Sequence, residues 1–126
     1  MKLKLKLVSA LLALTICEAH ADNVVVIGHA GLSKLNASTV QRIFTGKIIE
    51  IDGVHVKAVN LKASALRDRF LQRYLNQNDD KYTAYWTVRR FIGKGIPPKE
   101  LSSAAEVISF VQTTPGAIGY IDETEL

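Results

Sequence analysis

The sequence predicts a small α/β domain in which a mostly parallel sheet is flanked by helices. Short runs rich in β-branched residues alternate with segments whose apolar residues recur at helical spacing. Strands that alternate with helices are typical of a parallel sheet. Of the 126 residues, the first 21 have the pattern of a leader, and the 105 that follow have room for one hydrophobic core. We therefore expect a single domain at residues 22–126.

Residues 1–21 resemble a secretory signal peptide. Lys2, Lys4 and Lys6 form a charged start, residues 7–16 are apolar, and residues 19–21 read Ala-His-Ala, a small-x-small cleavage site. The apolar run is shorter than the roughly 20 residues that cross a bilayer. We therefore expect cleavage after residue 21 and export of the remainder.

A lipoprotein signal with Cys17 as the acylated residue is the alternative, and the bulky Ile16 before the cysteine disfavours it. Cleavage removes three lysines and Glu18, so the net charge falls from +4 to +2. The cleaved chain also has no cysteine, which excludes disulfides and thiol chemistry. A nearly neutral domain gives no indication of nucleic-acid binding.

The first elements follow from apolar runs and capping residues. Residues 24–27 are continuously apolar and β-branched, which is typical of a strand buried on both faces of a parallel sheet. After the glycine-rich loop at residues 28–31, apolar positions up to residue 44 predict a short helix. Asn36 or Ser38 would cap its start, and Gly46 lies just past its end.

The middle of the chain predicts a hairpin or a loop, then a strand and a helix. Residues 48–51 and 54–59 flank the turn signal Asp52-Gly53, so they form either a hairpin or a loop leading into one strand. Apolar residues at helical spacing from residue 66 onward predict a helix, with Ser64 at its N-cap position.

Three further elements complete the domain. Asp79 or Asp80 would cap a helix that ends at the glycines of residues 93–95. The two prolines after Ile96 require an extended segment. Ser103 with Glu106 forms a capping box for a last helix, and residues 115–121 read as a turn followed by a strand. The first of these two helices carries aromatic residues that we interpret as packing surface, namely Tyr82, Tyr85 and Trp86.

The start of the helix after Ser64 is a candidate anion site. The Ser64 hydroxyl and the free N–H groups of Ala65, Leu66 and Arg67 would point out of the helix start. Together with the positive end of the helix dipole, such donors can hold an oxyanion. Most capped helices bind nothing, so this motif needs support from elsewhere in the chain.

Five motifs in order resemble the phosphate-binding proteins of ABC transporters. The chain is similar to short stand-alone members of the type 2 periplasmic binding protein superfamily from about residue 24 to residue 121. The motifs are Ile43-Phe-Thr-Gly-Lys47, Ser64-x-x-Arg67-x-x-Phe70, Tyr85-Trp86, Phe91-Ile-Gly-Lys-Gly95 with Pro97-Pro98, and Pro115-Gly-Ala-Ile-Gly-Tyr120.

This resemblance implies an α/β fold, a periplasmic location, no catalysis, no cofactor, and phosphate or a similar oxyanion as ligand. It also implies an ABC transporter permease as a partner. The Ser-Gly-Thr motif of the full-length proteins matches Ser64, Ala65 and Leu66, and Asn60 stands where those proteins have an arginine. Arg67 and Lys62 lie close enough in sequence to compensate in part for the missing positive charge.

Ser33 and His29 of the glycine-rich opening loop are further candidate ligands, because open α/β sheets bind at the carboxyl ends of their strands. The length of the domain suffices for one lobe of a two-lobed binding protein, so a partner or a second copy would supply the other. The alternative function is an envelope interaction or sensor module that keeps the fold and has lost oxyanion binding. Exposed apolar surface would favour that alternative.

Other chemistries find little support in the sequence. His29 and His55 lack a cysteine or carboxylate at ligand spacing, which disfavours a metal site. Ser64 and His55 have no third partner for a hydrolytic triad. The Gly-Lys-Gly of residues 93–95 lacks the spacing of a phosphate-binding P-loop.

Overall fold

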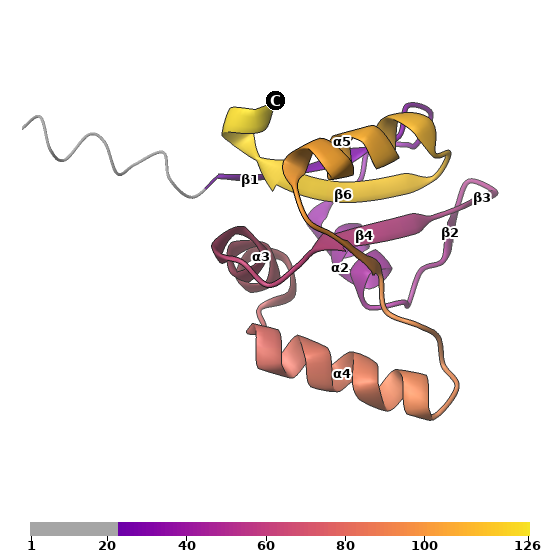
Figure 1. Cartoon of the computed structure of the whole chain (residues 1–126). Helices are drawn as coiled ribbons and strands as arrows, with labels where there is room; N and C mark the ends of the chain where they lie inside the picture. Colours follow the sequence, from indigo (N-terminus) through magenta and orange to yellow (C-terminus); the bar gives the residue numbers. More distant parts are fainter. Residues whose placement is uncertain (1–22) are drawn as a thin grey trace, which may run out of the picture.

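The computed structural model describes residues 23–126 (Figure 1). The predicted signal peptide lies outside the described residues. In chain order the elements are β1 (Val24–Gly28), α2 (Ala37–Phe44), β2 (Glu50–Ile51), β3 (Val54–His55), β4 (Lys57–Leu61), α3 (Ala65–Phe70), the π-helical turn η2 (Leu71–Leu75), α4 (Asp79–Phe91), β5 (Lys99–Leu101), α5 (Ala104–Thr113), β6 (Ala117–Asp122) and the 3₁₀ turn η3 (Glu123–Glu125).

The central sheet has four strands in the order β1-β6-β4-β5. Strand β4 is parallel to both of its neighbours, pairing Lys57 with Ala117 of β6 and Leu61 with Leu101 of β5. Within this four-stranded sheet, only the β1–β6 pair is antiparallel. The predicted α/β fold with a mostly parallel sheet is therefore confirmed.

The prediction that residues 24–27 form a strand is confirmed, but their predicted place in the sheet is wrong. Strand β1 lies at an edge of the sheet and runs antiparallel to β6, with Val24 opposite Asp122. Val24 is buried and the next three residues are only partly buried. A continuous apolar run indicates that a strand is buried. It does not indicate whether the strand runs parallel or antiparallel to its neighbour, because that depends on the partner strand.

Helices cover both faces of the sheet (Figure 1), with α5 on one and α2, α3 and α4 on the other. Successive residues of β6 show this division. A Cβ added to Gly119 would lie 2.8 Å from Val107 of α5, whereas the next residue, Tyr120, stacks on Phe70 of α3 at 3.9 Å between ring centroids. Because side chains alternate along a strand, these two contacts lie on opposite faces. Phe44 of α2 packs edge-on against Phe70 at 4.7 Å and closes the core on the α3 side.

The structure resolves two alternatives that the sequence left open, namely the N-cap of α2 and the conformation of residues 50–55. Asn36 caps α2, because its side chain accepts a hydrogen bond from the backbone N–H of Thr39 at 2.8 Å. Residues 50–55 form a two-stranded hairpin, β2–β3, in which Asp52 and Gly53 both have positive φ. That backbone conformation is the one a tight hairpin turn requires.

The predicted cap of α4 is wrong by one residue. Asn78 accepts from the backbone N–H of Lys81 at 2.8 Å, and Asp79 and Asp80 follow in the first turn. Acidic residues complement the helix dipole there without acting as the cap. The predicted helix end is confirmed, because Gly93 follows the last turn with a φ of 77°.

The sequence missed strand β5 and predicted α5 and β6. The extended segment after Ile96 continues into β5, whose three residues pair with the end of β4. Ser103 caps α5 as expected. No helix of residues 23–126 is long and apolar enough to cross a membrane.

Candidate functional site

The predicted anion site lies at the carboxyl edge of the parallel strands. Strands β4, β5 and β6 end there, at Leu61, Leu101 and Asp122. The starts of α3 and α5 face one open cavity of about 360 Å³, which we call the helix-start corner. Its lining comprises Leu61, Lys62, Ala63, Ser64, Leu66, Ser102, Ser103, Ala104, Asp122, Thr124 and Glu125.

Two of the three serine hydroxyls at this corner are engaged in capping. Ser64 Oγ accepts from the backbone N–H of Arg67, and Ser103 Oγ accepts from that of Glu106, each at 3.2 Å. The carboxylate of Glu106 in turn accepts from the Ser102 N–H at 2.6 Å. The oxygens of these two hydroxyls thus satisfy their own helices, as N-caps do, while their O–H groups and the remaining first-turn N–H groups can still donate to a ligand.

The Arg67 side chain lies inside the domain and does not line the helix-start corner, where the sequence predicted that it would help to bind an anion. Its Nε donates to Asp79 Oδ1 at 2.9 Å. Its Nη1 donates to Glu100 Oε2 and to the Leu61 carbonyl, each at 2.9 Å. The residue is 4% exposed. Burial lowers the pKa of Arg67, but the hydrogen bonds and charges of Glu100 and Asp79 more than offset this, so its pKa lies above the ordinary value. A guanidinium held in this way ties α3 to β5 and to the start of α4.

The charges of the helix-start corner do not favour an anion. Lys62 is the one cation among its lining residues, while Asp122 and Glu125 also line it. The Thr124 backbone and hydroxyl donate to Asp122, and these bonds lower the pKa of Asp122 below its ordinary value. Asp122 therefore stays ionised at neutral pH and would repel an oxyanion.

His29 and Ser33 lie at the opposite end of the strands from Ser64. Because β1 is antiparallel to β6, the end of β1 at Gly28 lies beside Ile118, near the start of β6. There a ring nitrogen of His29 hydrogen-bonds the Val111 carbonyl at 2.8 Å, and Ser33 donates to Asp52. The structure therefore keeps Ser64, Ala65 and Leu66 together and separates His29 and Ser33 from them.

Asn60, at the position where the resemblance places an arginine, belongs to a buried hydrogen-bond network. Its amide donates to the Tyr82 hydroxyl at 3.0 Å and accepts from the Tyr120 hydroxyl at 2.9 Å. The Tyr82 hydroxyl donates to the Phe44 carbonyl at 2.9 Å. The Leu61 N–H donates to the Tyr120 hydroxyl at 3.1 Å. Burial raises the pKa of both tyrosines. This network joins α2, α4 and the sheet, and gives Asn60 a structural role.

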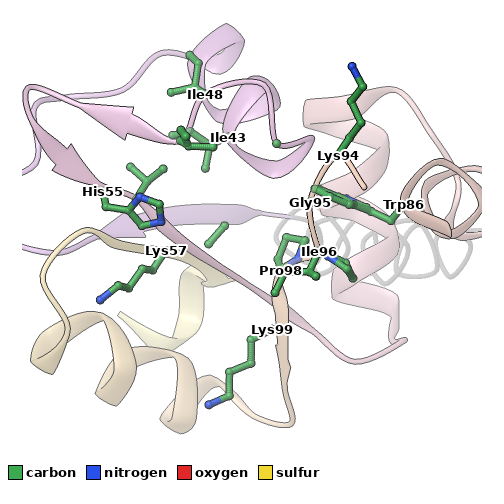
Figure 2. A pocket seen from close by; sticks show the side chains of 15 residues that line it. Ile43, Ile48, His55, Lys57, Trp86, Lys94, Gly95, Ile96, Pro98 and Lys99 are labelled. Carbon is green, nitrogen blue, oxygen red and sulfur yellow. The ribbon is translucent and has the colours of Figure 1, made fainter. Parts of the chain in front are cut away.

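A larger cavity lies near the amino ends of β4 and β5. Figure 2 shows it between the hairpin side, with Ile43, Ile48 and His55, and the segment of residues 94–99. Its volume is about 420 Å³, and we call it the lysine-rimmed pocket. It is lined by Ile43, Gly46, Ile48, Ile49, His55, Val56, Lys57, Ala58, Trp86, Lys94, Gly95, Ile96, Pro97, Pro98 and Lys99.

Trp86 forms one wall of this pocket and is fixed from several sides. Its indole N–H donates to the Phe44 carbonyl at 3.2 Å. A Cβ added to Gly46 would lie 2.7 Å from the indole ring, and one added to Gly95 would lie 3.8 Å from it. The Arg89 guanidinium lies 5.7 Å from the ring centroid. Gly46 therefore lets the chain approach the indole more closely than a residue with a Cβ could, and Gly95 packs against the ring at ordinary contact distance, so the aromatic wall is held in place.

Positive charge surrounds the pocket. Lys57, Lys94 and Lys99 line it together with His55, and no Asp or Glu of residues 23–126 does so. None of these lysines makes an ion pair within the part of the chain that the structure describes. Lys99 Nζ lies 5.9 Å from the Phe110 ring centroid. An uncompensated cluster of this kind attracts anions.

Sequence reasoning missed this pocket, although one signal was present. Residues 81–99 contain five basic residues and no acidic one, together with two exposed isoleucines and two prolines. Strand β5 brings this segment beside the start of β4, which no local pattern indicated.

Among residues 23–126, no group of three or more His, Cys, Asp and Glu side chains could hold a metal ion. No family model matches the chain, and no curated protein matches it.

Proposed function

We propose that the protein is a non-catalytic solute-binding module for an anionic ligand, with the lysine-rimmed pocket as its site. One observation carries this proposal, namely that three lysines and a histidine line a cavity of about 420 Å³ that no described carboxylate lines. Phosphate or a similar oxyanion belongs to this ligand class. Ligand sites of small molecules are typically concave cavities of roughly 300–1,000 Å³.

The lysine-rimmed pocket is a better anion site than the helix-start corner on electrostatic grounds. At the corner, Lys62 is opposed by Asp122 and Glu125, and Arg67 is committed to two carboxylates. At the pocket, Lys57, Lys94 and Lys99 act in the same direction. Apart from Lys62, the donors at the corner are uncharged hydroxyl and backbone N–H groups, whose hydrogen bonds add little net free energy where water competes for them.

The motif resemblance supports a solute-binding role in the periplasm and makes an ABC transporter permease the proposed partner. A solute-binding module delivers its ligand without changing it, so this proposal requires no catalytic group and no cofactor.

The test is thermal unfolding of the purified protein with phosphate, sulfate or naphthalene sulfonate at fixed ionic strength. An anion at 100 times its dissociation constant should stabilise the fold by about 2.7 kcal/mol, which is roughly 10 °C or more for a domain of this size. Lys94→Glu should reduce this stabilisation. Lys81→Glu is the matched control, because Lys81 is exposed on α4 outside the pocket lining.

Two results would overturn the proposal. Stabilisation by none of the three anions would exclude the anion-binding function. Stabilisation that Lys62→Glu abolishes and Lys94→Glu leaves unchanged would keep the function and move the site to the helix-start corner, as the sequence predicted.

A second candidate function is the interaction module that the sequence left open, with a second copy of the chain as the partner. Val88, Phe91 and Ile92 of the α4 end are 58%, 90% and 56% exposed, at spacings that place them on one side of the helix. A single-lobe domain could obtain its other lobe from such a copy. Sedimentation velocity should then detect a dimer that Phe91→Ser dissociates, and a monomer at all concentrations would exclude this candidate.

A further inference from the structure

We infer that the lysine-rimmed pocket takes an amphiphilic anion, meaning an aromatic or branched apolar body that carries a sulfonate or carboxylate group. This inference rests on the proposed anion-binding function and adds to it the apolar half of the ligand. It concerns a place in the fold to which the sequence assigned no ligand.

The walls of the pocket are apolar, so a bare inorganic ion would leave them in contact with water. Ile43 and Ile48 face it from the hairpin side, Val56 lies between β3 and β4, and Trp86 forms the opposite wall. Ile96 also lines the pocket and is 77% exposed. A large apolar side chain left this accessible beside a cavity is a surface that a ligand can cover. Each methylene group of a ligand that becomes buried there should tighten binding roughly fourfold.

The segment that closes one side offers few hydrogen-bond donors. Pro97 and Pro98 have no backbone N–H, and the indole N–H of Trp86 is already bonded to the Phe44 carbonyl. The middle of this wall, at Pro97, Pro98 and Trp86, therefore meets a ligand mainly through apolar surface. The charged donors for an acidic group are the lysine ammonium groups that line the same pocket.

The positive charges lie at the ends of the apolar wall. Figure 2 shows Lys94 and Lys99 extending from opposite ends of the segment Gly95–Pro98, with His55 on the hairpin side across the pocket. Lys57 lies on the same side as His55. An acidic group placed at the mouth can therefore meet a lysine while the apolar body contacts Trp86 and the isoleucines.

The volume also fits a ligand larger than an inorganic ion. At about 420 Å³ the pocket is more than ten times the roughly 30 Å³ that one water molecule occupies in the liquid. Fused aromatic rings with one acidic group fill such a space, whereas phosphate fills a small part of it.

Three matched probes separate the apolar from the charged contribution. Anilinonaphthalene sulfonate has both parts, phenylnaphthylamine has the rings without the charge, and methanesulfonate has the charge without the rings. Fluorescence titration of the purified protein should give saturable binding of one anilinonaphthalene sulfonate per chain. Phenylnaphthylamine should bind roughly twofold to fivefold more weakly, which is the size of an exposed charge interaction. A hundredfold excess of methanesulfonate should not displace the dye.

Four variants locate the dye. Lys94→Glu should weaken anilinonaphthalene sulfonate roughly threefold to tenfold and leave phenylnaphthylamine unchanged, whereas Ile96→Ser should weaken both. The matched controls are Lys81→Glu for charge and Phe91→Ser for exposed apolar surface, because neither residue lines the pocket. Both controls should leave binding of the two dyes unchanged.

Each contrary result has a distinct meaning. Displacement of the dye by the hundredfold excess of methanesulfonate would overturn this inference and leave the anion-binding function intact. Equal binding of the charged and neutral dyes, with no effect of Lys94→Glu, would overturn the inference and the anion-binding function together. Loss of dye binding in Phe91→Ser would place the dye on α4 and overturn the inference.

Discussion

Replacing Arg67 by alanine should unfold the domain at a lower temperature without weakening anion binding to the folded state. The side chain makes four contacts at 2.8–2.9 Å, to Asp79, Glu100 and the Leu61 carbonyl. The substitution leaves two carboxylates without their cation and a backbone carbonyl without its donor. The domain therefore loses the link between α3, β5 and the start of α4.

The size of the effect follows from burial. Removing one partner of a fully buried ion pair costs about 3–5 kcal/mol. Here the side chains of Asp79 and Glu100 are 36% and 51% exposed, so water can solvate the carboxylates once the guanidinium is gone. We therefore reduce the expected loss to about 2–3 kcal/mol, close to that of one or two hydrogen bonds to a charged group. For a domain of this size the unfolding midpoint should fall by roughly 10–20 °C.

Thermal unfolding followed by circular dichroism is the assay, with Arg90→Ala as the matched control. Arg90 is exposed on α4, and its side chain makes no hydrogen bond or ion pair within residues 23–126. Its removal should change the free energy of unfolding by less than about 0.5 kcal/mol. Arg67→Lys should fall between the two, because lysine keeps the charge and loses the planar fork that reaches three partners.

The outcome that would refute this reasoning is specific. If Arg67→Ala melted at the same temperature as Arg90→Ala and had lost its stabilisation by anions, the guanidinium would be a ligand and not a structural tie. That result would restore the role that the sequence predicted for Arg67.

Three further predictions concern the fold around the two cavities. Gly46→Ala should destabilise the domain by more than about 1 kcal/mol and shift the fluorescence emission of the single tryptophan. The reason is that the new Cβ would lie 2.7 Å from the Trp86 ring, on a residue with a φ of 76°. Unchanged emission would contradict this prediction. Ser64→Ala should cost about 1 kcal/mol in urea unfolding through the lost N-cap, and a cost near zero would show that water replaces it. Because burial raises the pKa of Tyr82 and Tyr120, the free energy of unfolding should fall as pH rises above about 10, where tyrosines of the unfolded chain ionise first. Urea unfolding at pH 8 and pH 11 checks this, and Tyr120→Phe should make the decline shallower.

Much of the local structure was predictable because it depends on neighbours in the sequence. Helix caps such as Ser64 and Ser103 bond to N–H groups three residues away, and the Asp52-Gly53 turn depends on the φ angles of two adjacent residues. Errors within this local structure were small, as with Asn78 in place of Asp79 as the cap of α4. Boundaries of this kind are the least certain part of any pattern.

The candidate site was less predictable because charge partners come from distant parts of the chain. Arg67 was singled out for its place in a helix-start motif, yet its partner Glu100 lies 33 residues away on a strand that the sequence missed. The same strand, β5, carries Lys99 to the lysine-rimmed pocket. A motif gives the position of a residue on a helix or strand. The packing of distant segments around that residue decides where its charged group lies and what it contacts.

The sequence by itself determined the fold class, the alternation of strands and helices, and most of the caps, since these arise from periodicity and from bonds within a few residues. Tertiary structure decided the direction of β1, which separated His29 and Ser33 from Ser64. It also decided which cations are neutralised in the interior and which remain at a surface cavity. The physical reason is that strand pairing and burial of charge are interactions between distant segments, and their free energies depend on which segments fold together.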